Sequence, residues 1–148
     1  MPKHTYTATY AGQVFTRTTH RTYTHLVIAR RSIDEAIARV HGEANSKTFA
    51  KDYAYYCREA NDATREFKHT EQQIARYQSI AAKVFAEYRN EWIAEHLAIV
   101  EKQRQKGWFD TFNVVGWCGR PDLAEKSAAS AKKQPWNAEV KIIPVTAK

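Results

Sequence analysis

The sequence predicts an α+β fold in which a mixed sheet of about five strands is interrupted by a long helical hairpin. Threonine alternates with larger side chains near the N-terminus, apolar side chains recur at spacings of four and three over residues 45–106, and a strand–helix–strand pattern occupies residues 107–148. A chain of 148 residues can bury one core. We therefore expect a single domain, 1–148, built from segments 1–44, 45–106 and 107–148.

The N-terminal segment is predicted to be a three-stranded antiparallel meander. Residues 4–10 alternate Thr with Tyr and Ala, and Thr and Tyr favour strands. Ala11 and Gly12 supply a turn into a second strand at residues 14–19. A tight link then leads to a third strand at residues 22–30.

Helices are predicted for the middle of the chain. Ser32 and Glu35 form a capping-box pattern that begins a short helix, which we expect to end at Gly42. A second helix is expected over residues 45–68 and a third from about residue 74 to 106, with an interruption at residues 69–73. One continuous helix of about 90 Å would also fit, but ordinary helix lengths favour a hairpin.

The C-terminal segment is predicted to be a β–α–β unit. A strand at residues 111–118 precedes a helix that starts at Pro121 and runs to about residue 133, and a closing strand follows at residues 140–145. Pro144 is expected at a sheet edge or a strand end. A right-handed crossover would make the two strands parallel.

The positive charge is uneven along the chain, whose formal net charge is +7. Residues 1–33 contain five basic and no acidic side chains, residues 34–105 have a net charge of −1, and residues 106–148 have +3. A basic N-terminus with interleaved aromatic residues indicates binding to a polyanion or to an acidic partner.

The candidate binding residues are basic or aromatic side chains of this hairpin, with one arginine at the start of the C-terminal helix. Guanidinium groups contact phosphates, and tyrosine rings offer bases a stacking surface. The candidates are Arg17, Arg21, Arg30, Arg31, Tyr6, Tyr23, His25 and Arg120. The alternative is a sheet face whose polar residues only keep its edge soluble, and for Arg120 an ordinary strand-to-helix turn.

No catalytic or metal-binding constellation is predicted. Glu91 lies five residues before His96 and Glu95 directly before it, and neither spacing matches the Glu-x-x-His pattern of di-metal bundles. Cys118 lies before a helix N-terminus, where a thiolate would be stabilised, but the sequence identifies no base to partner it. We therefore expect no enzyme, no metal and no cofactor. Two cysteines make no disulfide framework, and the sequence has neither a signal peptide nor a membrane span, so a cytoplasmic location and no membrane partner are expected.

Two short motifs resemble small uncharacterised proteins encoded by bacteriophages. They are Arg-Thr-Tyr-Thr-His at residues 21–25 and Gly-Arg-Pro-Asp-Leu-Ala at residues 119–124. The resemblance implies a phage or prophage accessory gene, acting in the bacterial cytoplasm on host or defence machinery. It implies no catalytic residues.

The leading hypothesis is a non-enzymatic binding protein, a phage accessory or anti-defence factor that engages nucleic acid or a nucleoprotein complex through its basic hairpin. The alternative is a protein–protein inhibitor or assembly module, including a homo-oligomer, that acts through the aromatic residues of the helical pair. The simplest interpretation of those aromatic residues, however, is a core between helices.

Overall fold

The computed structural model describes residues 2–148, and the fold is α+β as predicted. Over residues 2–148, six helices accompany six strands, which form two three-stranded antiparallel sheets. The chain folds into two compact units. Residues 2–35 and 102–148 form the sheet unit, and residues 36–101, inserted between its third and fourth strands, form the helical unit.

The first sheet is built on a tight N-terminal hairpin. Strands β1 (His4–Tyr10) and β2 (Gln13–Thr19) pair in antiparallel register across Ala11 and Gly12. Both turn residues have positive φ, 50° and 78°, as a two-residue hairpin turn of the primed type requires. The short strand β6 (Thr146–Ala147) pairs with the other edge of β1.

The second sheet places strand β3 (His25–Arg31) between β4 (Phe112–Cys118) and β5 (Asn137–Pro144), and both neighbours are antiparallel to it. The predicted meander is therefore wrong, because β3 does not pair with β2. The physical reason is burial: residues 26–29 are all at most 4% exposed, so β3 is covered on both faces and needs a partner at each edge. The single mixed sheet is likewise replaced by two antiparallel sheets.

The predicted strand–helix–strand unit is present in a modified form. Helix α6 (Pro121–Lys132) connects β4 to β5. Since β4 and β5 are both antiparallel to β3, they run in the same direction, but β3 lies between them. Pro144 is the last residue of β5, as expected for a residue that cannot donate a ladder hydrogen bond.

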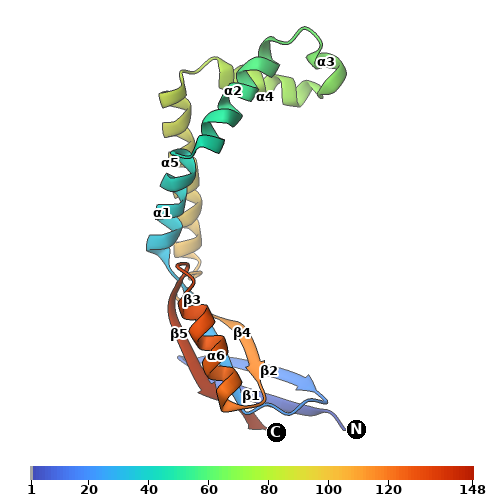
Figure 1. The fold of residues 1–148 in the computed structure, drawn as a ribbon, viewed down its shortest axis with the longest axis vertical. Coiled ribbons are helices and arrows are strands. Elements are labelled where there is room, and N and C mark those ends of the chain that lie inside the picture. The colour runs from blue at the N-terminus through green and yellow to red at the C-terminus, as the bar shows by residue number, and fades with distance from the viewer. Residues whose placement is uncertain (1) are drawn as a thin grey trace. The chain divides into compact units, whose positions relative to one another are not determined.

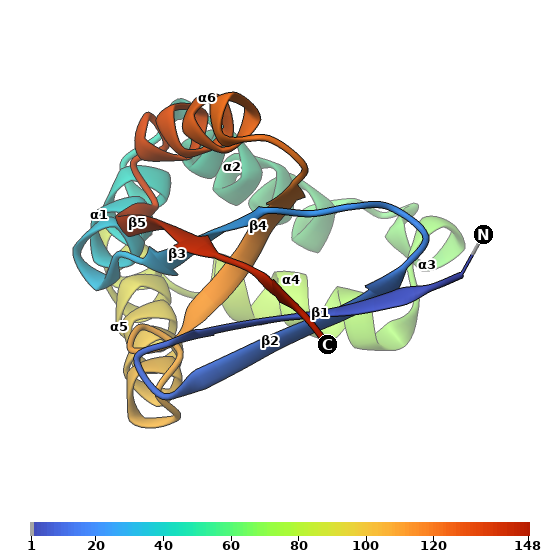
Figure 2. The same cartoon turned by 90° about the horizontal axis from the view of Figure 1, so that it is seen from below.

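The core of the sheet unit has two halves, one on each face of the second sheet. Helix α6 covers the face that contains Val27, where Ala124 and Ala128 pack. The β1–β2 hairpin covers the opposite face, where Ala8 packs with a cluster that includes Leu26 and Ile28. Figure 1 shows α6 lying along β3, β4 and β5, and Figure 2 shows the hairpin on the other side of these strands.

The helices begin and end differently from the prediction in three places. Helix α1 (Ile33–Ala44) starts where expected, with Ser32 Oγ accepting from the backbone N–H of Glu35 at 3.1 Å, but it continues through Gly42. The predicted second helix is divided into α2 (Lys47–Asn61) and α3 (Arg65–Lys68). The predicted third helix is divided into α4 (Glu71–Ala81) and α5 (Phe85–Gln105).

The helical hairpin is confirmed, and the continuous helix is not formed. Helices α2 and α4 pack against each other, with the rings of Tyr56 and Tyr77 stacked at 5.4 Å. The connection is held by local caps. Asp62 accepts two hydrogen bonds from Thr64, and Thr70 forms a capping box with Gln73.

Candidate nucleic-acid interface

The excess positive charge belongs to the sheet unit. That unit contains fourteen basic and six acidic side chains, a net charge of +8, whereas the helical unit contains nine basic and ten acidic side chains, a net charge of −1. A polyanion is therefore attracted to the sheet unit rather than to the helical unit.

The ring of Tyr23 lies at the centre of the side-chain contacts around Arg17. It lies 5.5 Å from the ring of Tyr6 in an edge-on arrangement and 5.9 Å from Trp117, measured between ring centroids. The guanidinium carbon of Arg17 lies 5.4 Å from the Tyr23 centroid, within range of a cation–π interaction. These contacts hold Arg17 at the end of the sheet unit where β3 begins.

The loop before β3 packs against the turn before α6. The backbone N–H of Thr24 donates to the carbonyl of Cys118 at 2.9 Å. A Cβ atom at Gly119 would lie 2.9 Å from the carbonyl oxygen of Thr22, closer than real Cβ contacts, so glycine permits this approach. The loop carries Arg21 and the turn carries Arg120, so the two arginines come from distant parts of the sequence to the same end of the unit.

We call this region the basic end. It consists of Lys3, His4, Arg17, His20, Arg21 and Arg120, and all six are exposed. His4 belongs to it because it pairs with Thr19 at the open end of the hairpin, and the hydroxyl of Thr19 accepts a hydrogen bond from the backbone of Arg21 at 3.2 Å.

Arg120 makes the one ion pair seen for a basic-end residue within residues 2–148. Its Nε atom lies 3.3 Å from Asp122 Oδ1, and both side chains are more than half exposed. An exposed pair of this kind contributes little, because water and salt compete for both charges. Arg120 also occupies the N-cap position of α6, whose backbone N–H groups favour anions.

The structure separates Arg30 and Arg31 from the other predicted residues. They lie at the far end of β3, about 20 Å from its start at 3.3 Å per residue. Arg30 is held internally, because it donates to the carbonyl of Phe109 at 3.2 Å and pairs with Glu139 at 3.4 Å. His25 lies at the near end, half-buried, with Nδ1 2.8 Å from the hydroxyl of Thr24.

The predicted stacking role of the tyrosines is wrong. Tyr6 is 4% exposed and Tyr23 is 8% exposed, so neither ring can stack on a base. The sequence held a signal for this, because residues 6 and 8 share one face of β1 and are both large or apolar, whereas Thr5, Thr7 and Thr9 occupy the other face. These two rings build the core that supports Arg17.

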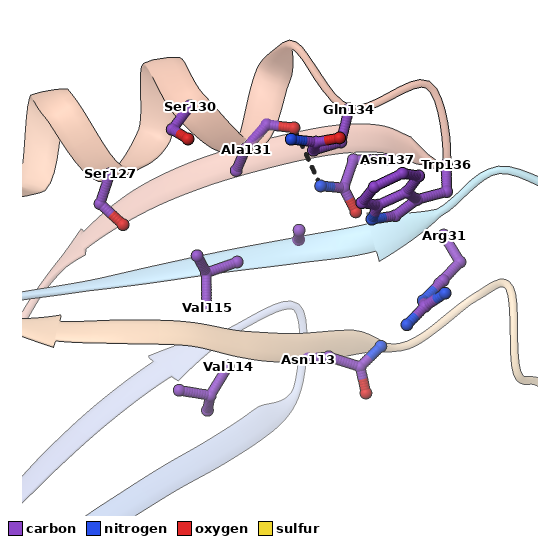
Figure 3. A pocket seen from close by; sticks show the side chains of 11 residues that line it. Arg31, Asn113, Val114, Val115, Ser127, Ser130, Ala131, Gln134, Trp136 and Asn137 are labelled. Atoms are coloured by element: carbon purple, nitrogen blue, oxygen red, sulfur yellow. Dashed lines mark hydrogen bonds between the residues drawn. The ribbon is translucent and has the colours of Figure 1, made fainter.

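Arg31 lies in a groove that sequence reasoning did not find. The groove has a volume of about 420 Å³ and separates α6 from β4 (Figure 3). Ala29 of β3 also lines it. Ser127 and Ser130 line it from α6, and Asn113 and Val115 line it from β4. No sequence signal could reveal it, because the lining residues come from four separate segments.

The remaining side chains offer little for catalysis or metal binding. Burial raises the pKa of the Cys118 thiol, which opposes a reactive thiolate at the start of α6. Among residues 2–148, no group of three or more His, Cys, Asp or Glu side chains is arranged to hold a metal ion. Over the same residues, no helix has both the length and the apolar character needed to cross a bilayer.

Comparison with known proteins gives no relative from which a function could be transferred: no family model, no curated protein and no solved structure matches the chain.

Proposed function

We propose that this protein is a non-enzymatic binding protein that contacts the phosphate backbone of nucleic acid through the basic end of its sheet unit. The observation that carries the proposal is the convergence of Arg17, Arg21 and Arg120 on one end of a unit whose net charge is +8. The guanidinium group of arginine binds phosphate oxygens with two parallel hydrogen bonds, so three exposed arginines provide a phosphate-binding surface.

The expected ligand is duplex rather than single-stranded nucleic acid. Binding of single strands uses exposed aromatic rings on which bases stack. The two tyrosines beside the basic end, Tyr6 and Tyr23, are core residues, so neither offers an exposed ring. The basic end therefore recognises the spacing and charge of phosphates, which are regular in a duplex, and it does so without sequence preference. The resemblance to bacteriophage-encoded proteins fits a target in a host nucleoprotein complex.

Fluorescence anisotropy with a labelled 20-base-pair duplex, and with one of its strands alone, tests this proposal. We expect affinity to fall steeply between about 50 and 200 mM salt, because phosphate contacts release counterions. The triple variant Arg17→Gln, Arg21→Gln, Arg120→Gln is expected to have a shallower slope of log affinity against log salt concentration. The slope should decrease by about three, one for each lost phosphate contact.

The matched control is the triple variant Lys47→Gln, Lys51→Gln, Arg58→Gln, which removes the same charge from exposed positions of the helical unit. It should lower affinity only slightly. Equal losses in the two triple variants would show that net charge alone attracts the duplex, and salt-independent binding would refute phosphate contact altogether.

A second candidate is a protein-docking role for the helical unit. The side chain of Phe67 in α3 is 91% exposed and that of Val84 is 69% exposed, so both offer apolar surface to a partner. Two other aromatic residues of the helical pair, Tyr53 and Trp92, pack within the helical unit, where Tyr53 contacts Phe85 and Trp92 contacts Phe49. Phe67→Ser should abolish capture of a partner from host lysate while leaving folding unchanged, whereas capture that survives this change would place the partner elsewhere.

A further inference from the structure

The outer edge of strand β4 has no strand partner within residues 2–148. The second sheet has the order β4-β3-β5, so β4 pairs with β3 on one side only. An unpaired edge presents backbone N–H and C=O groups to any extended chain that can align with it. Two valines of this strand, Val114 and Val115, are exposed by 48% and 43%.

The hydrogen bonds of Phe112, the first residue of β4, show which backbone groups of this edge point outward. Gln13 Nε2 donates to the carbonyl of Phe112 at 3.1 Å, and the N–H of Phe112 donates to Gln13 Oε1 at 2.7 Å. The Gln13 amide thus bonds to Phe112 as a residue of a neighbouring strand would. Since alternate residues of an antiparallel strand point their backbone groups the same way, Val114, two residues on and opposite Ile28, presents its N–H and C=O outward as well. The register against β3 shifts directly after Val114, so the regular part of this edge runs from Phe112 to Val114.

The groove beside this edge supplies a place for side chains. In Figure 3 the groove runs between α6 and β4, with Val115 projecting into it and Ser127 and Ser130 facing it from the helix. An extended chain that pairs with β4 alternates its side chains between the two faces of the sheet. Every second side chain of such a chain would therefore enter this groove.

The charge of the groove indicates which kind of extended chain it would bind. Arg31 is the one charged side chain among the groove residues, it is exposed, and no ion pair of Arg31 is found within residues 2–148. The surrounding sheet unit carries a net charge of +8. A carboxylate entering the groove would form a charge-assisted pair with Arg31, whereas an ammonium group would be repelled.

We propose that the edge of β4 binds an extended acidic peptide segment of a partner protein by strand addition. Backbone hydrogen bonds to Val114 provide the pairing, and the Arg31 groove accepts an aspartate or glutamate side chain. The Arg31 groove lies at the end of β3, whereas the basic end lies where β3 begins. The proposal does not depend on the proposed contact with nucleic acid.

The test uses two labelled octapeptides of alternating Val and Thr, identical except that one carries a central Asp and the other a central Lys. We expect the Asp peptide to bind the full-length protein at least tenfold more tightly than the Lys peptide. Arg31→Glu should reverse this preference. Equal binding of the two peptides, or no detectable binding of the Asp peptide at millimolar concentration, would overturn the proposal.

The strand-addition geometry is tested at Val114. Val114→Pro removes the outward N–H and should reduce binding of the Asp peptide at least tenfold, whereas Val114→Thr keeps the N–H and should bind as the wild type does. Amide hydrogen exchange provides a test without mutation, because the Asp peptide should slow exchange at Val114 in the wild-type protein. Unchanged exchange at Val114 in the bound state would refute pairing at this edge. If Arg31→Glu lost duplex binding but kept peptide binding, Arg31 would belong to the nucleic-acid surface instead.

Discussion

The side-chain amide of Gln13 is bonded on both sides to the backbone of Phe112, ninety-nine residues later in the sequence. It accepts from the N–H of Phe112 and donates to its carbonyl, and it thereby joins the start of β2 to the edge of β4. The two sheets of the unit are therefore joined by a polar contact in addition to the apolar core between them.

Gln13→Ala should lower the free energy of unfolding by about 1–3 kcal/mol. The change leaves a half-buried N–H and a half-buried carbonyl of Phe112 without partners, and unsatisfied groups incur the desolvation cost. Urea denaturation measures this. Thr16→Ala, an exposed position of the same strand, is the control and should change stability by less than about 0.5 kcal/mol. Equal effects of the two substitutions would show that water replaces the Gln13 amide without loss.

Tyr23→Ala should destabilise the sheet unit by about 3–5 kcal/mol, because it removes a buried ring that contacts Tyr6 and Trp117. Arg17→Gln should change stability by no more than about 1 kcal/mol, the value of one exposed cation–π contact. Urea denaturation measures the stability of each variant. Fluorescence anisotropy with folded Tyr23→Leu then measures duplex binding, so an effect on stability is distinguished from an effect on binding. A Tyr23→Leu variant that folds and binds duplex as tightly as the wild type does would show that the ring is not needed to position Arg17.

Phe49→Ala should destabilise the helical unit by about 3–5 kcal/mol. Its buried ring contacts Phe85, Tyr88 and Trp92, with centroids 5.2–5.9 Å apart, so truncation leaves a cavity between helices. Phe67→Ala, at a residue that is 91% exposed, should be nearly neutral. Thermal melts followed by circular dichroism at 222 nm report both. A neutral Phe49→Ala would mean that the aromatic cluster is not the core of this unit.

The helical hairpin should lose an acid-dependent contribution to stability as Asp62 is protonated. Hydrogen bonds from the backbone N–H and hydroxyl of Thr64 and from Lys68 lower the pKa of Asp62 from 3.8 to about 2. Because the folded pKa lies below the unfolded value, the stabilisation is fully present above about pH 4 and is lost as the pH falls towards 2. Denaturation at pH values between 2 and 5 should therefore show a weaker pH dependence in Asp62→Asn than in the wild type.

Asp52→Asn is the control for this titration, since Asp52 is an exposed carboxylate of α2. It should retain the pH dependence of the wild type. An Asp62 carboxyl that titrates near pH 4 in a carbon-detected NMR experiment would contradict the proposed hydrogen bonds.

Cys118 should react slowly with an aromatic disulfide reagent at pH 8, and Cys57 should react first. Cys118 is buried and burial raises its pKa, whereas Cys57 is half-buried. Cys57→Ser should remove the fast phase of the reaction, and Cys118→Ser the slow one. If the Cys118 thiol reacted faster than Cys57 in the folded protein, the result would support the hypothesis of a reactive cysteine at the start of α6.

Local chemistry in the sequence was sufficient to predict most helix and strand positions. The Ser32 and Thr70 caps, the turn at Ala11 and Gly12 and the start of α6 at Pro121 all depend on residues within four positions of one another. For the same reason the α+β class and the helical hairpin were predictable. The breaks at residues 62–64 and 82–84 were missed because helical periodicity continues across them.

Strand pairing and the binding surfaces were decided only by the tertiary structure. β3 follows β2 in the sequence, yet it pairs with β4 and β5, because its continuous run of buried residues is satisfied only at the centre of a sheet. The same pairing moved Arg30 and Arg31 away from Arg17 and brought Arg120 to Arg21. The sequence by itself determined which residues carry charge and which segments are helical or extended, because these are local properties. Only the tertiary structure decided which arginines lie at the same end of the sheet unit and that Tyr6 and Tyr23 are buried, because both depend on contacts between segments that are far apart in the chain.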